Sequence, residues 1–257
     1  MSALLRCRDL SRAFGGLLAL EGLDLDVEEG GVLGLIGPNG SGKTTFFNVL
    51  TGFFPATRGE VLFAGEPITG LSPQVVYRKG VARTFQRSRL CLPLSIFDNL
   101  LIGNHKHLDH RLWSNLVDRR ALRRQIEQTF AEARELVRIF DPPLADRLLE
   151  PASRIPMIDR RRIEVCRALI SRPRLLLLDE PSAGMTQEET MRLMDDILQV
   201  KSRLGGLTII LIEHEMTVIE RVTERCVVLN YGRKIAEGAY AEIARTPSVR
   251  EAYLGLE

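Results

Sequence analysis

The sequence has few cysteines, no long apolar run and almost no net charge, and each of these absences excludes a class of protein. Its 257 residues include four cysteines without any Cys-x-x-Cys spacing, so we expect neither a disulfide framework nor a zinc site. No segment approaches the roughly 18 apolar residues that span a bilayer, and the first residues lack the apolar core of a signal peptide. We therefore expect a cytosolic protein whose cysteines are small buried hydrophobic residues, namely Cys7, Cys91, Cys166 and Cys226.

The charge balance argues against a general nucleic-acid binder. The chain has 35 Lys plus Arg and 33 Asp plus Glu residues, which leaves a formal net charge of +2. Such a balance provides no overall field to hold a polyphosphate backbone. With 45% hydrophobic and 26% charged residues, the composition is that of a globular protein rather than a disordered tail or a small stapled scaffold. The length suits one large domain or one domain with a sizeable insertion.

The N-terminal part of the chain indicates strands that lead into a helix. Apolar and polar residues alternate over 4–10 and again over 23–27, with Gly15-Gly16 between them, which predicts two antiparallel strands. A buried strand is expected over 31–36. A glycine-rich turn and a helix over Lys43–Leu50 follow it, and the helix is expected to stop near Gly52.

The middle of the chain predicts a mostly helical insertion over about 96–150. Apolar residues recur at helical spacing from about 119 to 140, and Asp141-Pro-Pro ends the pattern. A basic cluster lies in this stretch, and we expect it to be a solvated helix face. It consists of Arg119, Arg120, Arg123 and Arg124.

After the insertion, helices and strands alternate, which predicts a parallel α/β sheet. The expected elements are a helix over 163–170, a strand over 175–178, a helix over 188–204, a strand over 207–212 and a helix over 216–221. A hairpin that turns at Gly232 and a final short helix complete the chain.

The segment Gly37-Pro-Asn-Gly-Ser-Gly-Lys43-Thr44 fits the phosphate-loop pattern Gly-x-x-x-x-Gly-Lys-Ser/Thr. Glycines let consecutive backbone N–H groups turn onto phosphate oxygens, the lysine reaches the β- and γ-phosphates, and the threonine offers a hydroxyl to Mg²⁺. The loop follows an expected strand and opens an expected helix, so we predict a nucleoside triphosphate site. Its expected binding residues are Gly37, Pro38, Asn39, Gly40, Ser41, Gly42, Lys43, Thr44 and Thr45.

The strand Leu175-Leu-Leu-Leu-Asp179 ends in a carboxylate and is followed by Glu180. At the carboxyl edge of a parallel sheet, Asp179 is expected beside the phosphate loop, where it can hold Mg²⁺ directly or through water. Glu180 is then free to take a proton from an attacking water.

With these two motifs in place, the sequence resembles the nucleotide-binding subunit of an ATP-binding cassette (ABC) transporter along essentially its whole length. The resemblance implies that Phe14 stacks on adenine, that Gln86 in Gly80-Val-Ala-Arg-Thr-Phe-Gln contacts Mg²⁺ or the attacking water, and that His214 contacts the γ-phosphate. The implied catalytic residues are Glu180, His214 and Gln86. The implied metal ligands are Thr44, Gln86 and Asp179, with ATP and Mg²⁺ as the bound groups.

The resemblance also implies an architecture. The fold class is α/β, with a P-loop NTPase core, a mostly parallel sheet, an N-terminal antiparallel β subdomain and a helical insertion. The expected core covers 1–95 and 160–257, and the helical subdomain covers 96–159. Several segments are similar to the ATPase subunits of bacterial branched-chain amino-acid importers, among them Leu35-Ile-Gly-Pro-Asn-Gly and the closing Ala252-Tyr-Leu-Gly. An amino-acid-like solute is therefore expected.

Family membership further implies transmembrane permease subunits, a second ATPase subunit and, indirectly, an extracytoplasmic solute-binding protein as partners. No nucleic-acid partner is expected, and the implied location is the cytoplasmic face of the inner membrane. Two other functions stay open. One is a soluble ABC ATPase that acts on DNA, ribosomes or cluster assembly, although such relatives usually carry a paired cassette, a long coiled coil or a zinc insertion. The other is a subunit that binds ATP with little hydrolysis.

One segment departs from the family pattern. The signature Leu-Ser-Gly-Gly-Gln is replaced by Ile155-Pro-Met-Ile-Asp159. Pro156 has no N–H group to offer a phosphate, Ile158 places a branched side chain where close backbone approach is needed, and Asp159 adds negative charge. We therefore expect an impaired half-site, and we expect this chain to pair with a different ATPase subunit that carries an intact signature.

Overall fold

The computed structural model describes residues 3–107 and 119–254. The chain forms two compact units. The first contains the described residues of Met1–Arg83, Arg174–Glu180 and Gly205–Glu257, and the second contains those of Thr84–Pro173 and Pro181–Leu204. The second unit is wider than the expected 96–159 subdomain because the helices that flank that stretch pack against its long central helix.

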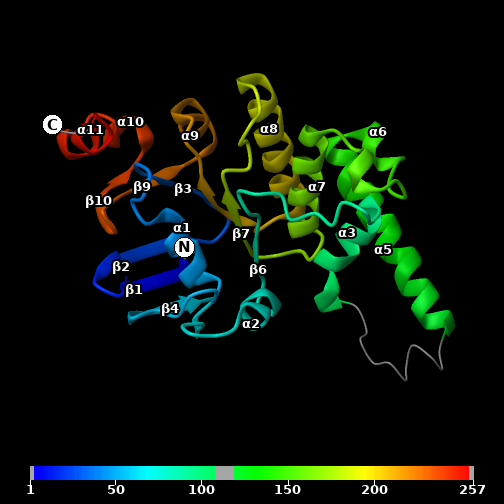
Figure 1. The fold of residues 1–257 in the computed structure, drawn as a ribbon, viewed down its shortest axis with the longest axis horizontal. Helices are drawn as coiled ribbons and strands as arrows, with labels where there is room; N and C mark the ends of the chain where they lie inside the picture. Colours follow the sequence, from blue (N-terminus) through cyan, green and yellow to red (C-terminus); the bar gives the residue numbers. More distant parts are fainter. Residues whose placement is uncertain (1–2, 108–118, 255–257) are drawn as a thin grey trace. The chain divides into compact units, whose positions relative to one another are not determined.

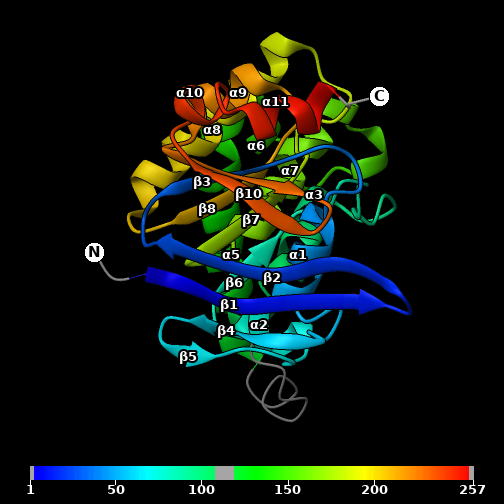
Figure 2. The same cartoon turned by 90° about the vertical axis from the view of Figure 1, so that its left-hand side faces the viewer.

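The first unit contains an antiparallel sheet in the order β2-β1-β4-β5 (Figure 2). Its strands are β1 (Ala3–Phe14), β2 (Leu17–Glu28), β4 (Arg58–Phe63) and β5 (Glu66–Pro67). The expected N-terminal pair of antiparallel strands is confirmed, with Phe14 opposite Leu17 at the turn. Burial alternates over Leu5–Arg8 of β1 and over Leu23–Glu28 of β2, which agrees with the alternating sequence there, since one face of the sheet packs on the core.

The same unit contains a six-stranded sheet in the order β10-β9-β3-β8-β7-β6. The strands are β3 (Val32–Ile36), β6 (Val81–Arg83), β7 (Leu175–Asp179), β8 (Thr208–Ile212), β9 (Arg225–Asn230) and β10 (Arg233–Gly238). All neighbours are parallel except β9 and β10, which form the expected hairpin. Every residue of β3, β7 and β8 is buried, as expected for central strands covered on both faces.

Helix α1 (Lys43–Leu50) and both sheets of the first unit share one core. Phe46 and Phe47 of α1 are fully buried and belong to the same hydrophobic cluster as Leu5 of β1, Leu35 of β3 and Leu177 of β7. The core therefore fixes α1, and the loop before it, at the carboxyl end of β3. The other helices of this unit are α2 (Pro73–Arg78), α9 (Met216–Val222), α10 (Tyr240–Ile243) and α11 (Pro247–Leu254).

The second unit is helical. Its α-helices are α3 (Ile96–Gly103), α5 (Arg119–Phe140), α6 (Pro142–Ala145), α7 (Met157–Leu169) and α8 (Gln187–Leu204), and short 3₁₀ helices cover His105–His107 and Ala152–Arg154 (Figure 1). Ser95 and Asp98 form a capping box that starts α3. At the other end of α3, a Cβ on Gly103 would lie 2.2 Å from the carbonyl oxygen of Arg167, so only glycine permits this close approach to α7.

The structure changes three details of the sequence-based expectations. Two helices follow the final hairpin instead of one, because Pro247 starts a new helix after α10. Cys91 is exposed, so the expectation of four buried cysteines is wrong for this residue, while Cys7, Cys166 and Cys226 are buried. Cys91 lies in the irregular segment between β6 and α3 and is not part of a helix or strand. The helix expected from Ile163 begins earlier, at Met157.

Two other expectations on the helical stretch have clear outcomes. The four clustered arginines at the start of α5 are all exposed, as predicted for a solvated face. The part of the expected insertion that covers 108–118 lies outside the described residues. Within the described part of the chain, no helix is both long and apolar enough to cross a membrane.

Candidate active site

The loop between β3 and α1 has backbone conformations that require glycine. Gly37 has φ 146°, Gly40 has φ 78° and Gly42 has φ 107°. A Cβ on Gly37 would lie 2.1 Å from the carbonyl oxygen of Leu229 on β9, so a side chain at this position is excluded. The glycines of the phosphate-loop pattern are thus required by the backbone path as well as by the approach of a ligand.

Lys43 lies at the start of α1 with its side chain folded back over this loop. Its Nζ donates hydrogen bonds to the carbonyl oxygens of Gly37, at 2.6 Å, and of Pro38, at 3.0 Å. Burial lowers the pKa of Lys43, and the nearby carboxylates of Glu180 and Asp179 act in the opposite direction. A buried cation surrounded by main-chain oxygens is a site prepared for an anion.

The N-terminus of α1 adds to this preference for negative charge. The capping residue is Gly42, which has no side chain to accept a hydrogen bond from the first turn. The first N–H groups of an α-helix have no partner within the helix and carry partial positive charge. Thr44 is exposed and Thr45 is half-buried in this turn, while Ser41 is buried in the loop. The loop and helix together form an anion site.

Two acidic residues and one histidine lie at the carboxyl ends of the neighbouring strands β7 and β8. Asp179 is the last residue of β7 and is 2% exposed. Glu180 follows with φ 48°, and its N–H donates to the carbonyl oxygen of Ile212 at the end of β8. Nε2 of His214 lies 2.7 Å from Oε1 of Glu180. The strand order thus brings together residues that are far apart in the sequence.

Arg83 is a member of this cluster that sequence analysis did not select. It ends β6, the strand beside β7, and its NH2 lies 2.6 Å from Oδ2 of Asp179. Its NH1 donates to Oδ1 of Asn48 on α1 at 2.7 Å. The three-residue strand β6 is too short to show a period in the sequence, so no signal marked Arg83 as a buried residue.

Phe14 lies at the end of β1, on the hairpin turn of the antiparallel sheet. Its side chain is accessible, with a relative exposure of 39%. The edge of the Phe54 ring packs against it with ring centroids 5.2 Å apart, and the Arg12 guanidinium lies 4.4 Å from its centroid. An accessible ring held in place from two sides can stack on a flat ligand.

Gln86 belongs to the second unit and so is not part of the cluster formed by the first unit. Its side chain is exposed, and its carbonyl oxygen accepts a hydrogen bond from Arg161 on α7 at 2.7 Å. Arg161 also pairs with the buried Glu164. The loop that carries Gln86 is therefore attached to α7.

The segment that replaces the family signature forms the entry to α7. Ile155 is 1% exposed, whereas Met157 is 69% exposed. Arg160 fixes the entry through a hydrogen bond to the carbonyl oxygen of Ile155 at 2.7 Å. Asp159 forms an ion pair with Arg162, in which its Oδ1 lies 2.8 Å from NH1 of Arg162. The helix still begins with backbone N–H groups, but without a hydroxyl or glycine.

The C-terminal helix α11 also reaches the phosphate loop. Ser248, Glu251 and Ala252 of α11 line a pocket together with residues 38–41 of the loop. Burial raises the pKa of the Tyr253 phenol to about 12, and the backbone of Gly37 acts in the opposite direction. A cavity of about 330 Å³ is lined by Ile36, Tyr240, Ile243 and Tyr253, among others. The final helix is expected from the sequence, but its contact with the phosphate loop is not.

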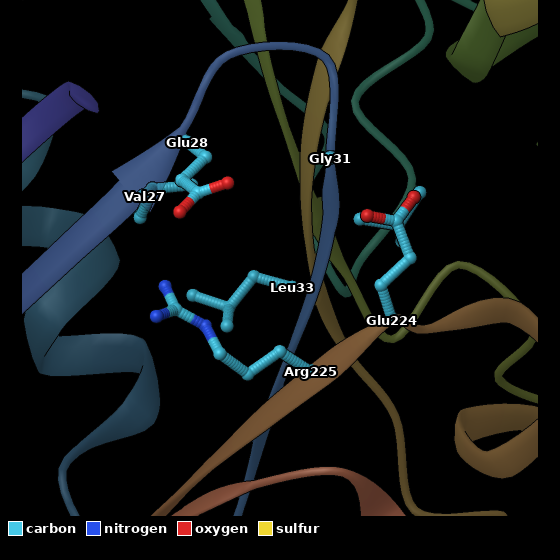
Figure 3. Close-up of a pocket in the computed structure, with 7 residues that line it drawn as sticks. Val27, Glu28, Gly31, Leu33, Glu224 and Arg225 are labelled. Atoms are coloured by element: carbon cyan, nitrogen blue, oxygen red, sulfur yellow. The ribbon is translucent and has the colours of Figure 1, made fainter. Parts of the chain in front are cut away.

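A second cavity, of about 200 Å³, lies at the other end of β3 (Figure 3). Glu28, Glu224 and Arg225 surround the start of the strand. Arg225 is already bound to the carbonyl oxygen of Asp26 and to Glu237. Because the phosphate loop follows the carboxyl end of β3, this cavity is separate from the candidate site.

Two family descriptions match the chain. Residues 20–183 match the ABC transporter family, and residues 233–257 match the branched-chain amino acid ATP-binding cassette transporter family. The chain belongs to the ABC transporter family. The family expected from the sequence motifs is therefore confirmed, and the chain is an ABC ATPase.

This ABC ATPase is similar to known transport proteins over nearly its whole length. It is 38% identical over 252 residues to the high-affinity branched-chain amino acid transport ATP-binding protein BraF of Pseudomonas aeruginosa, with 98% of each chain covered. It is 39% identical over 253 residues to the protein LivG of Salmonella typhimurium, which has the same descriptive name, again with 98% of each chain covered.

The fold comparison agrees with the sequence comparison. A nucleotide-free ATP-binding cassette from an ABC transporter superposes with a TM-score of 0.84 at 29% identity, and the match covers 99% of this chain and 100% of the other. The predicted α/β fold class, with a mostly parallel sheet and an antiparallel β subdomain, is confirmed.

Proposed function

We propose that this ABC ATPase is the peripheral ATP-hydrolysing subunit of an importer for branched-chain amino acids or chemically similar solutes. The observation that carries the proposal is the cluster of Lys43, Asp179, Glu180 and His214 at the ends of β3, β7 and β8. The names of the two bacterial relatives support the solute class.

In this proposal the triphosphate binds between the phosphate loop and the start of α1. Lys43 exchanges its hydrogen bonds to two carbonyl oxygens for contacts to the β- and γ-phosphates, which are stronger because both partners are charged. The exposed ring of Phe14 stacks on the adenine. The residues from Gly37 to Thr45 supply main-chain and hydroxyl contacts.

The oxygen-bearing residues of the site suit Mg²⁺, which binds through one or two protein side chains together with substrate phosphates. Among the residues that the structure describes, no group of three or more His, Cys, Asp or Glu side chains could hold a metal ion by itself. We propose that Mg²⁺ binds here together with the phosphates of the nucleotide. The proposed ligands are the exposed Thr44 hydroxyl, Asp179 and Gln86. When bound, the ion supplies positive charge that offsets the charge of the phosphates.

Glu180 is the proposed general base. Its side chain is 16% exposed, which leaves it accessible at the edge of the sheet, and its carboxylate is oriented by the 2.7 Å contact with His214. A carboxylate in this position can accept a proton from water as the water attacks the γ-phosphorus. His214 is 45% exposed, and we propose that it contacts the γ-phosphate.

The proposal includes partners that the chain itself does not contain. Permease subunits would carry the solute across the membrane, a solute-binding protein would deliver it, and this chain would lie on the cytoplasmic face of the inner membrane. A second ATPase subunit with an intact signature would complete the phosphate-loop site of this chain. The hydroxyl-free and glycine-free entry to α7 supports a heterodimer over a homodimer.

The first test is calorimetry of MgATP binding to the full chain and to Lys43→Ala. We expect tight binding by the wild type and none by the variant, because the removed charge faces the phosphates. The matched control is Lys79→Ala, which removes a lysine that pairs with Glu66 at the surface of the same unit. Equal affinity of wild type and Lys43→Ala would refute the site.

The second test separates a transporter subunit from a soluble ATPase or an inactive ATP-binding subunit. We expect the tagged chain to copurify with membrane permease subunits from its source cells, and the complex to release phosphate at steady state. Copurification with ribosomes or DNA instead would support the soluble alternative. A complex that binds MgATP without releasing phosphate would support the inactive alternative.

A further inference from the structure

We propose that Arg83 is a positioning residue that holds the Asp179 carboxylate and sets how strongly nucleotide binding depends on Mg²⁺. The inference rests on the proposed function, and it concerns a residue outside the phosphate loop and outside the set of proposed catalytic and metal-binding residues. It follows from the contacts of a single buried guanidinium.

The ion pair between Arg83 and Asp179 is almost completely removed from water. The two side chains are 5% and 3% exposed, and NH2 of Arg83 lies 2.6 Å from Oδ2 of Asp179. In the described parts of the chain, the other tight Arg–carboxylate pairs within the first unit lie nearer the surface; the pair of Arg174 with Glu29, for example, has exposures of 48% and 40%. Coulomb interactions are strongest where water is excluded.

The Arg83 guanidinium has further contacts besides the ion pair with Asp179. Its NH1 group donates to Oδ1 of Asn48 at 2.7 Å, and its central carbon lies 5.3 Å from the centroid of the Phe47 ring. Asn48 and Phe47 belong to α1, the helix that begins at the phosphate loop. Arg83 therefore connects the Asp179 strand to the helix that carries Lys43 and Thr44.

This geometry gives Arg83 two opposite effects on a bound magnesium nucleotide. A fixed positive charge beside Asp179 disfavours a divalent cation at that carboxylate, because like charges repel. The same charge favours the polyphosphate, which is anionic. Arg83 therefore allows the site to bind nucleotide with less help from Mg²⁺ than an unpaired Asp179 would permit.

The competing explanation is a structural one, in which Arg83 only joins β6, β7 and α1. Both explanations predict a lower melting temperature when Arg83 is replaced, since removing one partner leaves a buried charge uncompensated. They differ in the ratio of the ATP dissociation constant in EDTA to that with excess Mg²⁺. A purely structural residue leaves this ratio unchanged.

The experiment measures this ratio and the melting temperature of the nucleotide-free full chain for the wild type and three variants. Arg83→Met keeps much of the side-chain volume without charge, Arg83→Gln keeps a hydrogen-bond donor without charge, and Arg83→Lys keeps the charge without the planar fork. We expect the ratio to rise about tenfold in the two neutral variants and to stay near the wild-type value in the Lys variant.

The matched control is Arg174→Met, which breaks the exposed pair of Arg174 with Glu29 just before β7, the strand that ends in Asp179. Its ratio should equal that of the wild type. If Arg83→Met does not fold, Arg83→Gln decides the question. A ratio within twofold of wild type in the folded neutral variant would overturn the inference. Failure of the wild type to bind MgATP at all would instead refute the proposed function, so the two failures are distinguishable.

Discussion

Nε2 of His214 lies 2.7 Å from Oε1 of Glu180, and this contact joins the residues that follow β8 and β7. The peptide N–H of Glu180 also bonds to the carbonyl oxygen of Ile212, two residues before His214. Backbone and side-chain contacts together therefore fix Glu180, whose φ of 48° is unusual for a residue with a side chain. Strain of this kind persists where the surrounding structure holds the residue in place.

We expect Glu180→Gln to bind MgATP normally and to hydrolyse it about 10²–10⁴ times more slowly, since this is the usual contribution of a general base. The amide keeps the shape of the side chain but cannot accept the proton. Steady-state phosphate release by the assembled transporter measures the rate, with Glu220→Gln on the surface of α9 as the control. Near-normal turnover would mean that Glu180 has a structural role only.

For His214→Ala we expect hydrolysis to fall by about 10²–10³-fold, as when one donor that stabilises transition-state charge is removed. The imidazole is 45% exposed, so the melting temperature of the nucleotide-free chain should change by less than about 2 °C. The same phosphate-release assay and a thermal melt check both parts. A large drop in melting temperature would indicate that the histidine mainly supports the fold.

The entry to α7 provides a prediction about subunit pairing. Replacing residues 156–159 with Ser, Gly, Gly and Gln should speed the proposed heterodimer only modestly, by less than about threefold, because in that proposal the working site pairs the phosphate loop of this chain with the partner's signature. Glu180→Gln should nearly silence the same complex. Robust hydrolysis by the isolated chain, with a steep dependence on protein concentration, would contradict the heterodimer.

Asp196 of α8 predicts a pH effect on stability. Burial raises the pKa of its carboxyl to about 6. The positive charge of Arg162 acts in the opposite direction, and the negative charges of Asp195 and Asp141 add to the effect of burial. The folded state thus binds this proton more tightly than the unfolded state. The free energy of unfolding therefore falls as the pH rises from about 4 to about 6, and the loss is complete above that range.

Replacing Asp196 with Asn removes this penalty. After allowance for partial exposure, we expect a gain of about 1 kcal/mol at about pH 7.5, or roughly 2–4 °C in melting temperature. The gain should disappear near pH 4. Thermal melts over this range test the sign, with Glu220→Gln on the exposed surface of α9 as the control, because Glu220 is not among the charges that shift the pKa of Asp196. A gain that is the same at both pH values would show that the charge of Asp196 is not its cause.

The sequence predicts the parts of the site that are encoded locally. Helix α1 spans Lys43–Leu50 as expected, because the phosphate-loop pattern marks its start to the residue. The position of Asp179 at the end of β7 was also predictable, since an uninterrupted apolar run followed by an acidic residue indicates a buried strand. The assignment of chemical roles to these residues stays a prediction.

Long-range packing explains what the sequence did not reveal. Arg83 is polar and lies in a three-residue strand, so only the neighbouring strand and α1 make it a buried residue. The exposure of Cys91 likewise depends on which surfaces the rest of the second unit covers. The pairing of Asp159 with Arg162 is the exception, because a spacing of three residues on a helix predicts such a contact.

The strand order has a consequence for biosynthesis. In the six-stranded sheet, β8 pairs with β3 on one side and with β7 on the other. The strand that leads into the phosphate loop, β3, is therefore not paired with β7, the strand that ends in Asp179. During translation, β3 and β7 are synthesised before β8 (Thr208–Ile212). Until β8 has left the ribosome, the strand that lies between them in the sheet is missing. Non-local pairing of this kind forms late, and a chain truncated before residue 205 would expose the apolar edges of β3 and β7 in place of a finished site.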